Sequence, residues 1–178
     1  MTAPDAIYQV FIEAPIETVW AELVKTDEVL PFFFGSVCKI TGELTIGSPI
    51  AMQTVNGKYR SVVGEVLEFD PPRRYVHTFK FTNYEDDPCT VAYDLKEVPG
   101  GVQFSLTTSN VPSGTKTEKD MAQGGELIVN TLKSVVETGR PAFGTRMLLT
   151  MIGLFQPFTP KASRSENWSF EKILGLKN

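Results

Sequence analysis

Hydrophobic residues recur at helical spacing within residues 115–139, the longest amphipathic stretch of the chain. The apolar positions step by four, three, four and three residues, which places them on one helical face. They are Met121, Gly125, Ile128, Leu132 and Val135. Thr115 and Glu118 have the spacing of a capping box, so we expect the helix to begin there. The pattern predicts one long helix late in the chain.

The N-terminal region combines a strand pattern with a helix pattern. Residues 6–13 alternate between apolar and polar positions, which predicts a strand with one buried face. Pro15 suits the first turn of a following helix. The buried face of that helix is predicted to carry Ile16, Val19, Trp20 and Leu23. A short helical turn is expected at 27–31, ahead of three phenylalanines at 32–34.

From residue 36 onward, strand patterns alternate with turn residues, which predicts an antiparallel meander. The strand candidates are 37–43, 49–55, 58–69, 74–82, 89–97 and 102–109. Asn56-Gly57 predicts a type I′ hairpin with positive φ at both positions. This order of elements predicts an α+β fold, in which the long helix crosses the concave face of a curved sheet. Because helix and sheet separate where the sheet curves, we expect a pocket between them.

Three segments resemble the START-like, or SRPBCC, superfamily, and within it the heat-shock ATPase activator-homologue group. They are IEAPIETVW at 12–20, GEVLEFDPPRR at 64–74, and Gly124 followed by LKSVVETG at 132–139. The resemblance implies the helix-grip fold over residues 1–140, with 141–178 as a C-terminal extension. It also implies a cavity for a hydrophobic or aromatic small molecule between the sheet and the long helix.

The glycine pair Gly124-Gly125 departs from the resemblance. Members of this group often carry tryptophan after the first glycine, whereas this chain has Gly125. Each glycine in a helix interior costs about 1 kcal/mol relative to alanine. We therefore predict a looser grip around Gly125, which leaves room for a ligand. The alternative is a close contact between helix and sheet without a ligand.

The candidate ligand-binding residues lie on the predicted inner faces. Strand alternation places Tyr75, His77 and Phe79 on one face, and Tyr93 lies on the inward face of a later strand. The remaining candidates are Phe33, Met121, Gly125 and Ile128. His77 is interpreted either as a hydrogen-bonded core residue or as a polar contact for a ligand, and its pKa can also suit a general base.

Composition and motifs exclude several classes of protein. The net charge of −4 offers no basic surface for nucleic acid. One histidine and two separated cysteines, Cys38 and Cys89, give no metal-binding pattern, so no metal or cofactor is expected. No signal peptide is recognisable, which favours a cytoplasmic protein. The apolar run at 147–155 is far shorter than the ~20 residues of a membrane span, so no stable membrane insertion is expected.

The C-terminal extension contains a second apolar pattern. Residues 146–155 predict a helix that ends near Pro157, followed by an extended tail anchored by Trp168 and Phe170. A helix this apolar is expected to pack against another surface. It can pack on its own domain, lie on a second subunit as a homodimer, or close the pocket mouth. We favour the first two arrangements over membrane association.

Three hypotheses for function follow. The first is a binding protein for a hydrophobic small molecule. The second is a polyketide cyclase- or hydrolase-like enzyme using His77 or Tyr93, and the third is an interaction module like the chaperone ATPase activators. We rank binding first, since no convergent acid, base and oxyanion groups are visible.

Overall fold

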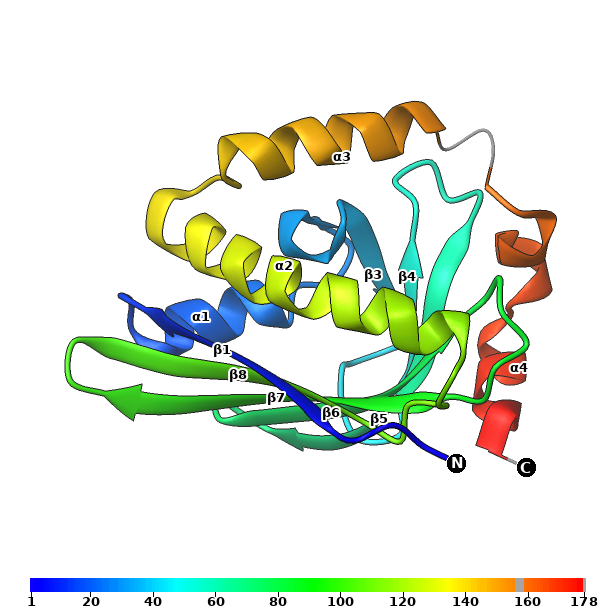
Figure 1. Ribbon diagram of the computed structural model, residues 1–178, viewed down its shortest axis with the longest axis horizontal. Coiled ribbons are helices and arrows are strands. Elements are labelled where there is room, and N and C mark those ends of the chain that lie inside the picture. Colours follow the sequence, from blue (N-terminus) through cyan, green and yellow to red (C-terminus); the bar gives the residue numbers. More distant parts are fainter. Residues whose placement is uncertain (156–158, 178) are drawn as a thin grey trace.

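In the computed structural model, an antiparallel sheet curls around one long helix (Figure 1). The structure describes residues 1–155 and 159–177, and within them eight strands pair in the order β1-β8-β7-β6-β5-β4-β3-β2. The strands are β1 (Ala6–Ile12), β2 (Val29–Leu30), β3 (Ser36–Ile40), β4 (Pro49–Gln53), β5 (Arg60–Asp70), β6 (Arg74–Phe81), β7 (Cys89–Val98) and β8 (Gly101–Ser109). The helices are α1 (Ile16–Leu23), α2 (Lys116–Thr138), α3 (Phe143–Phe155) and α4 (Phe170–Leu174).

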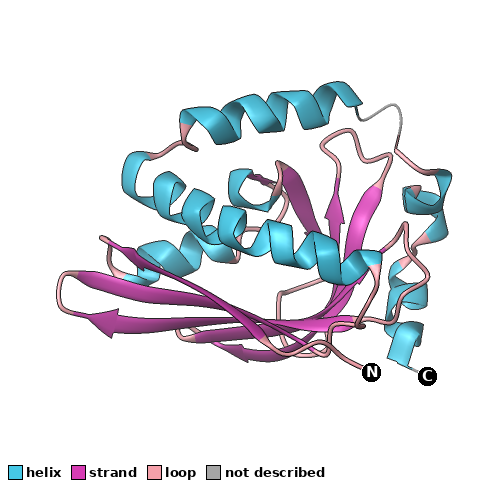
Figure 2. Ribbon diagram, in the orientation of Figure 1, coloured by secondary structure: helices cyan, strands magenta, loops and turns pink. Residues whose placement is uncertain are grey.

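The helices α1 and α2 cover the concave face of the sheet (Figure 2), which is the arrangement of a helix-grip fold. The predicted α+β fold is therefore confirmed. The core lies between these layers, and its fully buried side chains include Ile12, Phe104 and Leu132. The predicted inner face of the first helix is also confirmed, because Ile16, Val19, Trp20 and Leu23 are all buried. The predicted alternation of the first strand is confirmed as well, since exposed and less exposed positions alternate along β1.

The ends of α2 follow from its sequence. The Glu118 N–H donates to Oγ1 of Thr115 at 3.2 Å, as a capping box requires. The Glu118 carboxylate accepts from the N–H of Gly114 at 2.6 Å rather than from Thr115. At the other end, Gly139 has a φ of 73° and its N–H donates to the Val135 carbonyl at 2.8 Å. A left-handed glycine is a common helix stop.

Two local predictions are wrong. At Asn56-Gly57 only Gly57 has positive φ, and the backbone N–H of Thr54 donates to Tyr59 O at 2.9 Å, so the hairpin loop is longer than two residues. The helical turn expected at 27–31 lies later, as the 3₁₀ turn η1 (Pro31–Phe33), after the two-residue strand β2. Pro31 fixes φ at a value that suits the start of a turn.

The C-terminal tail packs on the outer face of the sheet, on the right in Figure 1. Trp168 and Ile173 are buried against Ala51 of β4 and Val63 of β5. The tail runs through the 3₁₀ turns η3 (Lys161–Ser163) and η4 (Ser165–Asn167) before α4, and η5 (Gly175–Lys177) follows α4. Pro157, the predicted helix stop, lies outside the described residues. The tail thus covers apolar groups on the convex side, away from the concave core.

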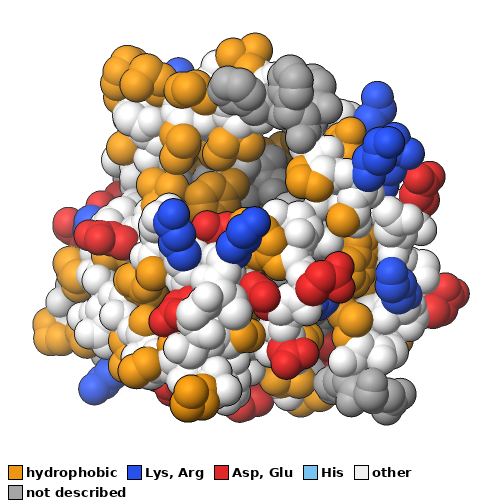
Figure 3. Space-filling view, turned by 45° about the vertical axis from the view of Figure 1, so that its right-hand side comes forward, with side chains coloured by type: hydrophobic (Ala, Val, Ile, Leu, Met, Phe, Trp, Pro, Cys, Tyr) orange, Lys and Arg blue, Asp and Glu red, His pale blue; other side chains and the backbone are white. Residues whose placement is uncertain are grey.

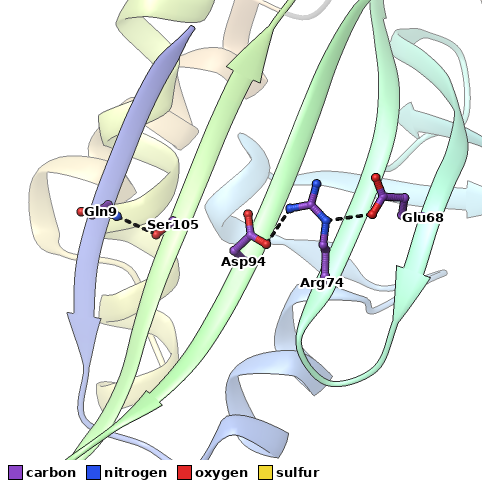
Figure 4. A network of polar contacts seen from close by, with 5 residues as sticks. All are labelled: Gln9, Glu68, Arg74, Asp94 and Ser105. Atoms are coloured by element: carbon purple, nitrogen blue, oxygen red, sulfur yellow. Dashed lines mark hydrogen bonds and ion pairs between the residues drawn. The ribbon is translucent and has the colours of Figure 1, made fainter.

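Charged groups on the outer face are paired with each other (Figure 4). The Arg74 guanidinium donates to Glu68 at 2.8 Å and to Asp94 at 2.6 Å. Beside this network, the amide of Gln9 donates to Ser105 at 3.0 Å. The two carboxylates raise the pKa of Arg74. Because strand neighbours alternate, these groups point away from Tyr75 and its inward-facing neighbours.

Candidate functional site

A row of rings lines the inner face of β6. Tyr75, His77 and Phe79 are buried, and their predicted common orientation is confirmed by stacking along the strand. Tyr93 of β7 lies opposite Tyr75 in the sheet, with ring centroids 5.7 Å apart. The alternation of β6 and its register with β7 therefore place two phenol rings around one imidazole.

An enclosed cavity lies against this row, and we call it the His77 cavity. Its floor is formed by Tyr75, His77 and Tyr93. Its other walls come from the end of α1 and the residues after it, from β2 and the turn η1, from β3 and β4, and from the connection between β3 and β4. The wall residues are Leu23, Val24, Lys25, Leu30, Phe32, Phe33, Cys38, Leu44 and Met52. The space measures about 10 Å³, which is close to the minimum for one water molecule.

The imidazole of His77 is fully buried, with no exposed surface. Its Nδ1 lies 2.8 Å from the carbonyl oxygen of Thr78. A carbonyl only accepts hydrogen bonds, so Nδ1 carries the proton and Nε2 presents a lone pair. Nε2 has no partner among the described residues. Burial lowers the pKa of His77 from 6.5 to about 4, because the charged form loses its hydration.

The hydroxyls of Tyr75 and Tyr93 and the thiol of Cys38 are also neutral in the His77 cavity. Burial raises the pKa of the Cys38 thiol to about 12, and it raises the pKa of the Tyr75 and Tyr93 hydroxyls as well. The wall residue Lys25 holds its ammonium 2.6 Å from Glu22, and this hydrogen bond raises the Lys25 pKa. At neutral pH the floor therefore offers hydrogen bonds without charge, and Cys38 is a protonated thiol rather than a nucleophile.

The structure brings together half of the predicted site residues. Phe33, Tyr75, His77 and Tyr93 line the His77 cavity. Phe79 lies beside it, with its ring centroid 6.3 Å from that of Phe33. The three candidates from α2, namely Met121, Gly125 and Ile128, are buried in the core but do not line this cavity.

The predicted loose packing at Gly125 is wrong. A Cβ built on Gly125 would lie 2.3 Å from the ring of Tyr8 on β1. The Tyr8 hydroxyl donates to the carbonyl of Ala122 in α2 at 3.4 Å. The tyrosine ring thus occupies the position that a larger helix residue would take, and the alternative of close packing between helix and sheet holds at this point.

Several residues of the His77 cavity could not be identified as site residues from the sequence. Cys38 and Met52 read as ordinary strand residues, and Leu23 as a buried helix residue. Cys38 and Met52 reach the His77 cavity because the sheet curls until β3 and β4 face β6 and β7. Curvature of this kind depends on contacts between distant strands, which a local pattern does not encode.

A larger and open groove lies between the C-terminal tail and the connection from β3 to β4. It measures about 860 Å³ and is lined in part by Ile46, Phe170 and Leu174. Arg60 in its wall already donates to the Trp168 carbonyl and lies over the Phe170 ring. Among the described residues, the buried unpartnered side-chain atoms are Nε2 of His77 and Oγ1 of Thr131, neither in this groove. We therefore take the His77 cavity as the candidate site.

The described part of the chain offers neither a metal centre nor a membrane-spanning helix. No group of three or more potential metal ligands from histidine, cysteine, aspartate or glutamate is found there. No helix in residues 1–155 and 159–177 has the length and apolar character for crossing a membrane.

Comparison with solved structures shows the same fold. The Aha1 dimer from Colwellia psychrerythraea matches with a TM-score of 0.62 and 17% identity, covering 77% of this chain and 98% of that one. An HSP90 activator from Plasmodium falciparum matches with a TM-score of 0.57 and 21% identity, covering 78% of this chain and 99% of that one. CalU16 from Micromonospora echinospora matches with a TM-score of 0.58 and 20% identity, covering 86% of this chain and 89% of that one.

Comparison of the sequence with protein families gives one assignment. No curated protein matches the chain. The family model described as "Activator of Hsp90 ATPase homolog 1-like protein" matches residues 13–137. This match spans more than half of the chain and contains α1, strands β2 to β8 and nearly all of α2. The chain therefore belongs to the family of activator of Hsp90 ATPase homolog 1-like proteins.

Proposed function

We propose that the protein binds a small, mostly apolar molecule in the His77 cavity. The supporting observation is the composition of this cavity, in which an imidazole and two phenol groups form the floor of a pocket with largely apolar walls. Ligand pockets commonly combine apolar walls with a few polar groups that orient the ligand. The ligand lies nearer to η1 and α1 than the position under α2 that the sequence predicts.

The binding of any molecule larger than water requires the wall to move. Phe32 and Phe33 in η1 form part of the wall, and they follow a strand of only two residues. Phe34, directly after the turn, has a left-handed φ of 54°, and Gly35 has a φ of 71°. A left-handed phenylalanine is a strained conformation of the kind found at ligand clamps. We therefore propose that a ligand displaces this turn.

The test compares two buried cysteines. Cys38→Val adds a methyl group in the His77 cavity, whereas Cys89→Val makes the same change at a buried site outside it. With millimolar toluene or phenol, the melting temperature of the wild type should rise by about 2–4 °C for each kcal/mol that the bound probe adds to the free energy of unfolding. Cys89→Val should retain this rise and Cys38→Val should lose it. The proposal fails if neither probe raises the wild-type melting temperature, or if the two variants respond equally.

A second proposed function, protein docking, is favoured by the exposed apolar side chains of α3. Figure 3 shows hydrophobic side chains gathered over this helix. The exposed ones are Phe143, Met147, Leu148, Met151, Ile152 and Leu154. Arg146 is the one charged residue in the helix, and Leu149 lies against Gly35. Contiguous exposed apolar side chains mark interaction sites, and we propose a second copy of the chain as the partner, paired through α3.

Light scattering after size-exclusion chromatography tests this assembly. The wild type should elute with twice the monomer mass of 19.7 kDa. Met147→Glu with Met151→Glu introduces two charges, four residues apart, on an exposed face of α3 and should give the monomer. Ile7→Glu, on the exposed face of β1, is the control and should remain dimeric. A monomeric wild type would exclude the homodimer.

A further inference from the structure

We infer that the ligand is a neutral aromatic molecule whose hydroxyl or N–H group donates a hydrogen bond to Nε2 of His77. Phenol is the simplest molecule of this class. The inference rests on the proposed function, because it names the ligand class for the same cavity.

The direction of the hydrogen bond follows from the tautomer. The carbonyl of Thr78 accepts from Nδ1 at 2.8 Å, so Nε2 has no proton to give. Nε2 is shielded from solvent and has no partner among the described residues. Nearly all buried polar groups in proteins are hydrogen-bonded. A ligand that completes this site must therefore bring a donor, and a group that only accepts leaves the lone pair unsatisfied.

The aromatic character follows from the rings around the imidazole. The ring centroids of Tyr75, Tyr93 and Phe79 lie 5.2, 5.8 and 6.4 Å from that of His77. Phe33 closes the cavity from the other side. A flat ring can pack on these faces and edges at the usual 4.5–7 Å centroid separation, so a planar apolar body fits better than a branched or polar one.

The expected neutrality of the ligand follows from the charges of the groups that line the cavity. The imidazole, the two phenols and the Cys38 thiol are all uncharged at neutral pH. Lys25 holds its ammonium against Glu22, with Glu28 at 3.9 Å. An anion would lose its hydration without gaining an unpaired cation. A carboxylate of similar size to phenol, such as benzoate, should therefore be rejected.

The single histidine of the chain gives a direct readout. With ¹⁵N-labelled histidine, the imidazole nitrogens of the wild type give signals from His77 alone. Phenol should move the Nε2 resonance towards that of a hydrogen-bonded nitrogen, whereas toluene should not. Phenol should also bind roughly tenfold more tightly than toluene, the ratio for one net hydrogen bond, and benzoate should bind least. In His77→Phe, which lacks the acceptor, the preference for phenol over toluene should disappear.

The outcomes separate this inference from the proposed function. If toluene and phenol bind equally and leave Nε2 unchanged, the ligand class is wrong although a binding cavity exists. If benzoate binds most tightly, the neutral class is wrong. If Nε2 is already hydrogen-bonded without a probe and phenol does not change its signal, the cavity holds water only and the inference is overturned. If no probe binds, the proposed function itself fails, and the inference fails with it.

Discussion

Replacing Phe33 by alanine should lower the free energy of unfolding by about 3–5 kcal/mol, the usual cost of removing a buried phenylalanine ring. Phe33 is only 3% exposed. Its ring packs against those of Phe34 and Phe79, with centroids 5.9 and 6.3 Å away. Urea unfolding monitored by circular dichroism measures the loss, provided that the slope with denaturant is unchanged.

The same substitution should increase ligand binding. Phe33 is part of the wall of the His77 cavity, so its removal adds the volume of a ring to that space. Apolar cavities of this size bind small aromatic molecules. Toluene should therefore recover part of the lost stability of Phe33→Ala and bind it more tightly than the wild type.

The control for this experiment is Ile7→Ala. Ile7 lies on the outer face of β1 and is 62% exposed, so its truncation should change the free energy of unfolding by less than about 0.5 kcal/mol. Toluene should not distinguish this variant from the wild type. A loss below about 1 kcal/mol in Phe33→Ala would mean that the turn η1 is not a structural wall of the cavity.

Sequence periodicity predicted the features that depend on neighbours along the chain. The buried face of α2 and its start at Thr115 follow from spacing and local capping. The inward orientation of Tyr75, His77 and Phe79 follows from strand alternation. The order of elements was likewise sufficient to predict the α+β fold, whereas the helix-grip fold was implied by the resemblance to the START-like superfamily.

The incorrect predictions depend on residues distant in sequence. The space beside Gly125 is filled by the ring of Tyr8, which lies on the first strand. No sequence pattern around Gly125 identifies Tyr8 as its partner. The position of the cavity depends on how far the sheet curls, which brings Cys38 and Met52 towards His77. The predicted site residues are therefore correct where strand alternation determines their orientation. The prediction missed the residues that only tertiary contacts bring to the cavity.

Stability should fall as the pH falls from 6.5 to 5, because of the protonation of His77. The unfolded chain takes up a proton near the usual imidazole pKa of 6.5, while the folded chain takes it up only near a pKa of about 4. Between these values the unfolded state binds more protons, so the free energy of unfolding decreases as pH decreases. The full effect is about 3 kcal/mol, with about 2 kcal/mol of it between pH 6.5 and 5.

The pH range from 6.5 to 5 distinguishes the contribution of His77 to stability from the contributions of the carboxylates. Arg74 lowers the pKa of Glu68, and the N–H of Glu13 lowers that of Glu137. Their contributions to stability are complete above the unfolded value of 4.5 and are lost only below it. Urea unfolding at pH 7, 6 and 5 should therefore show the decrease in the wild type and a nearly constant stability in His77→Gln. An equal slope in both proteins would show that the imidazole takes up its proton as readily in the folded chain as in the unfolded chain. About a quarter of the imidazole would then be protonated at pH 7, and Nε2 would no longer be held as a neutral acceptor by burial.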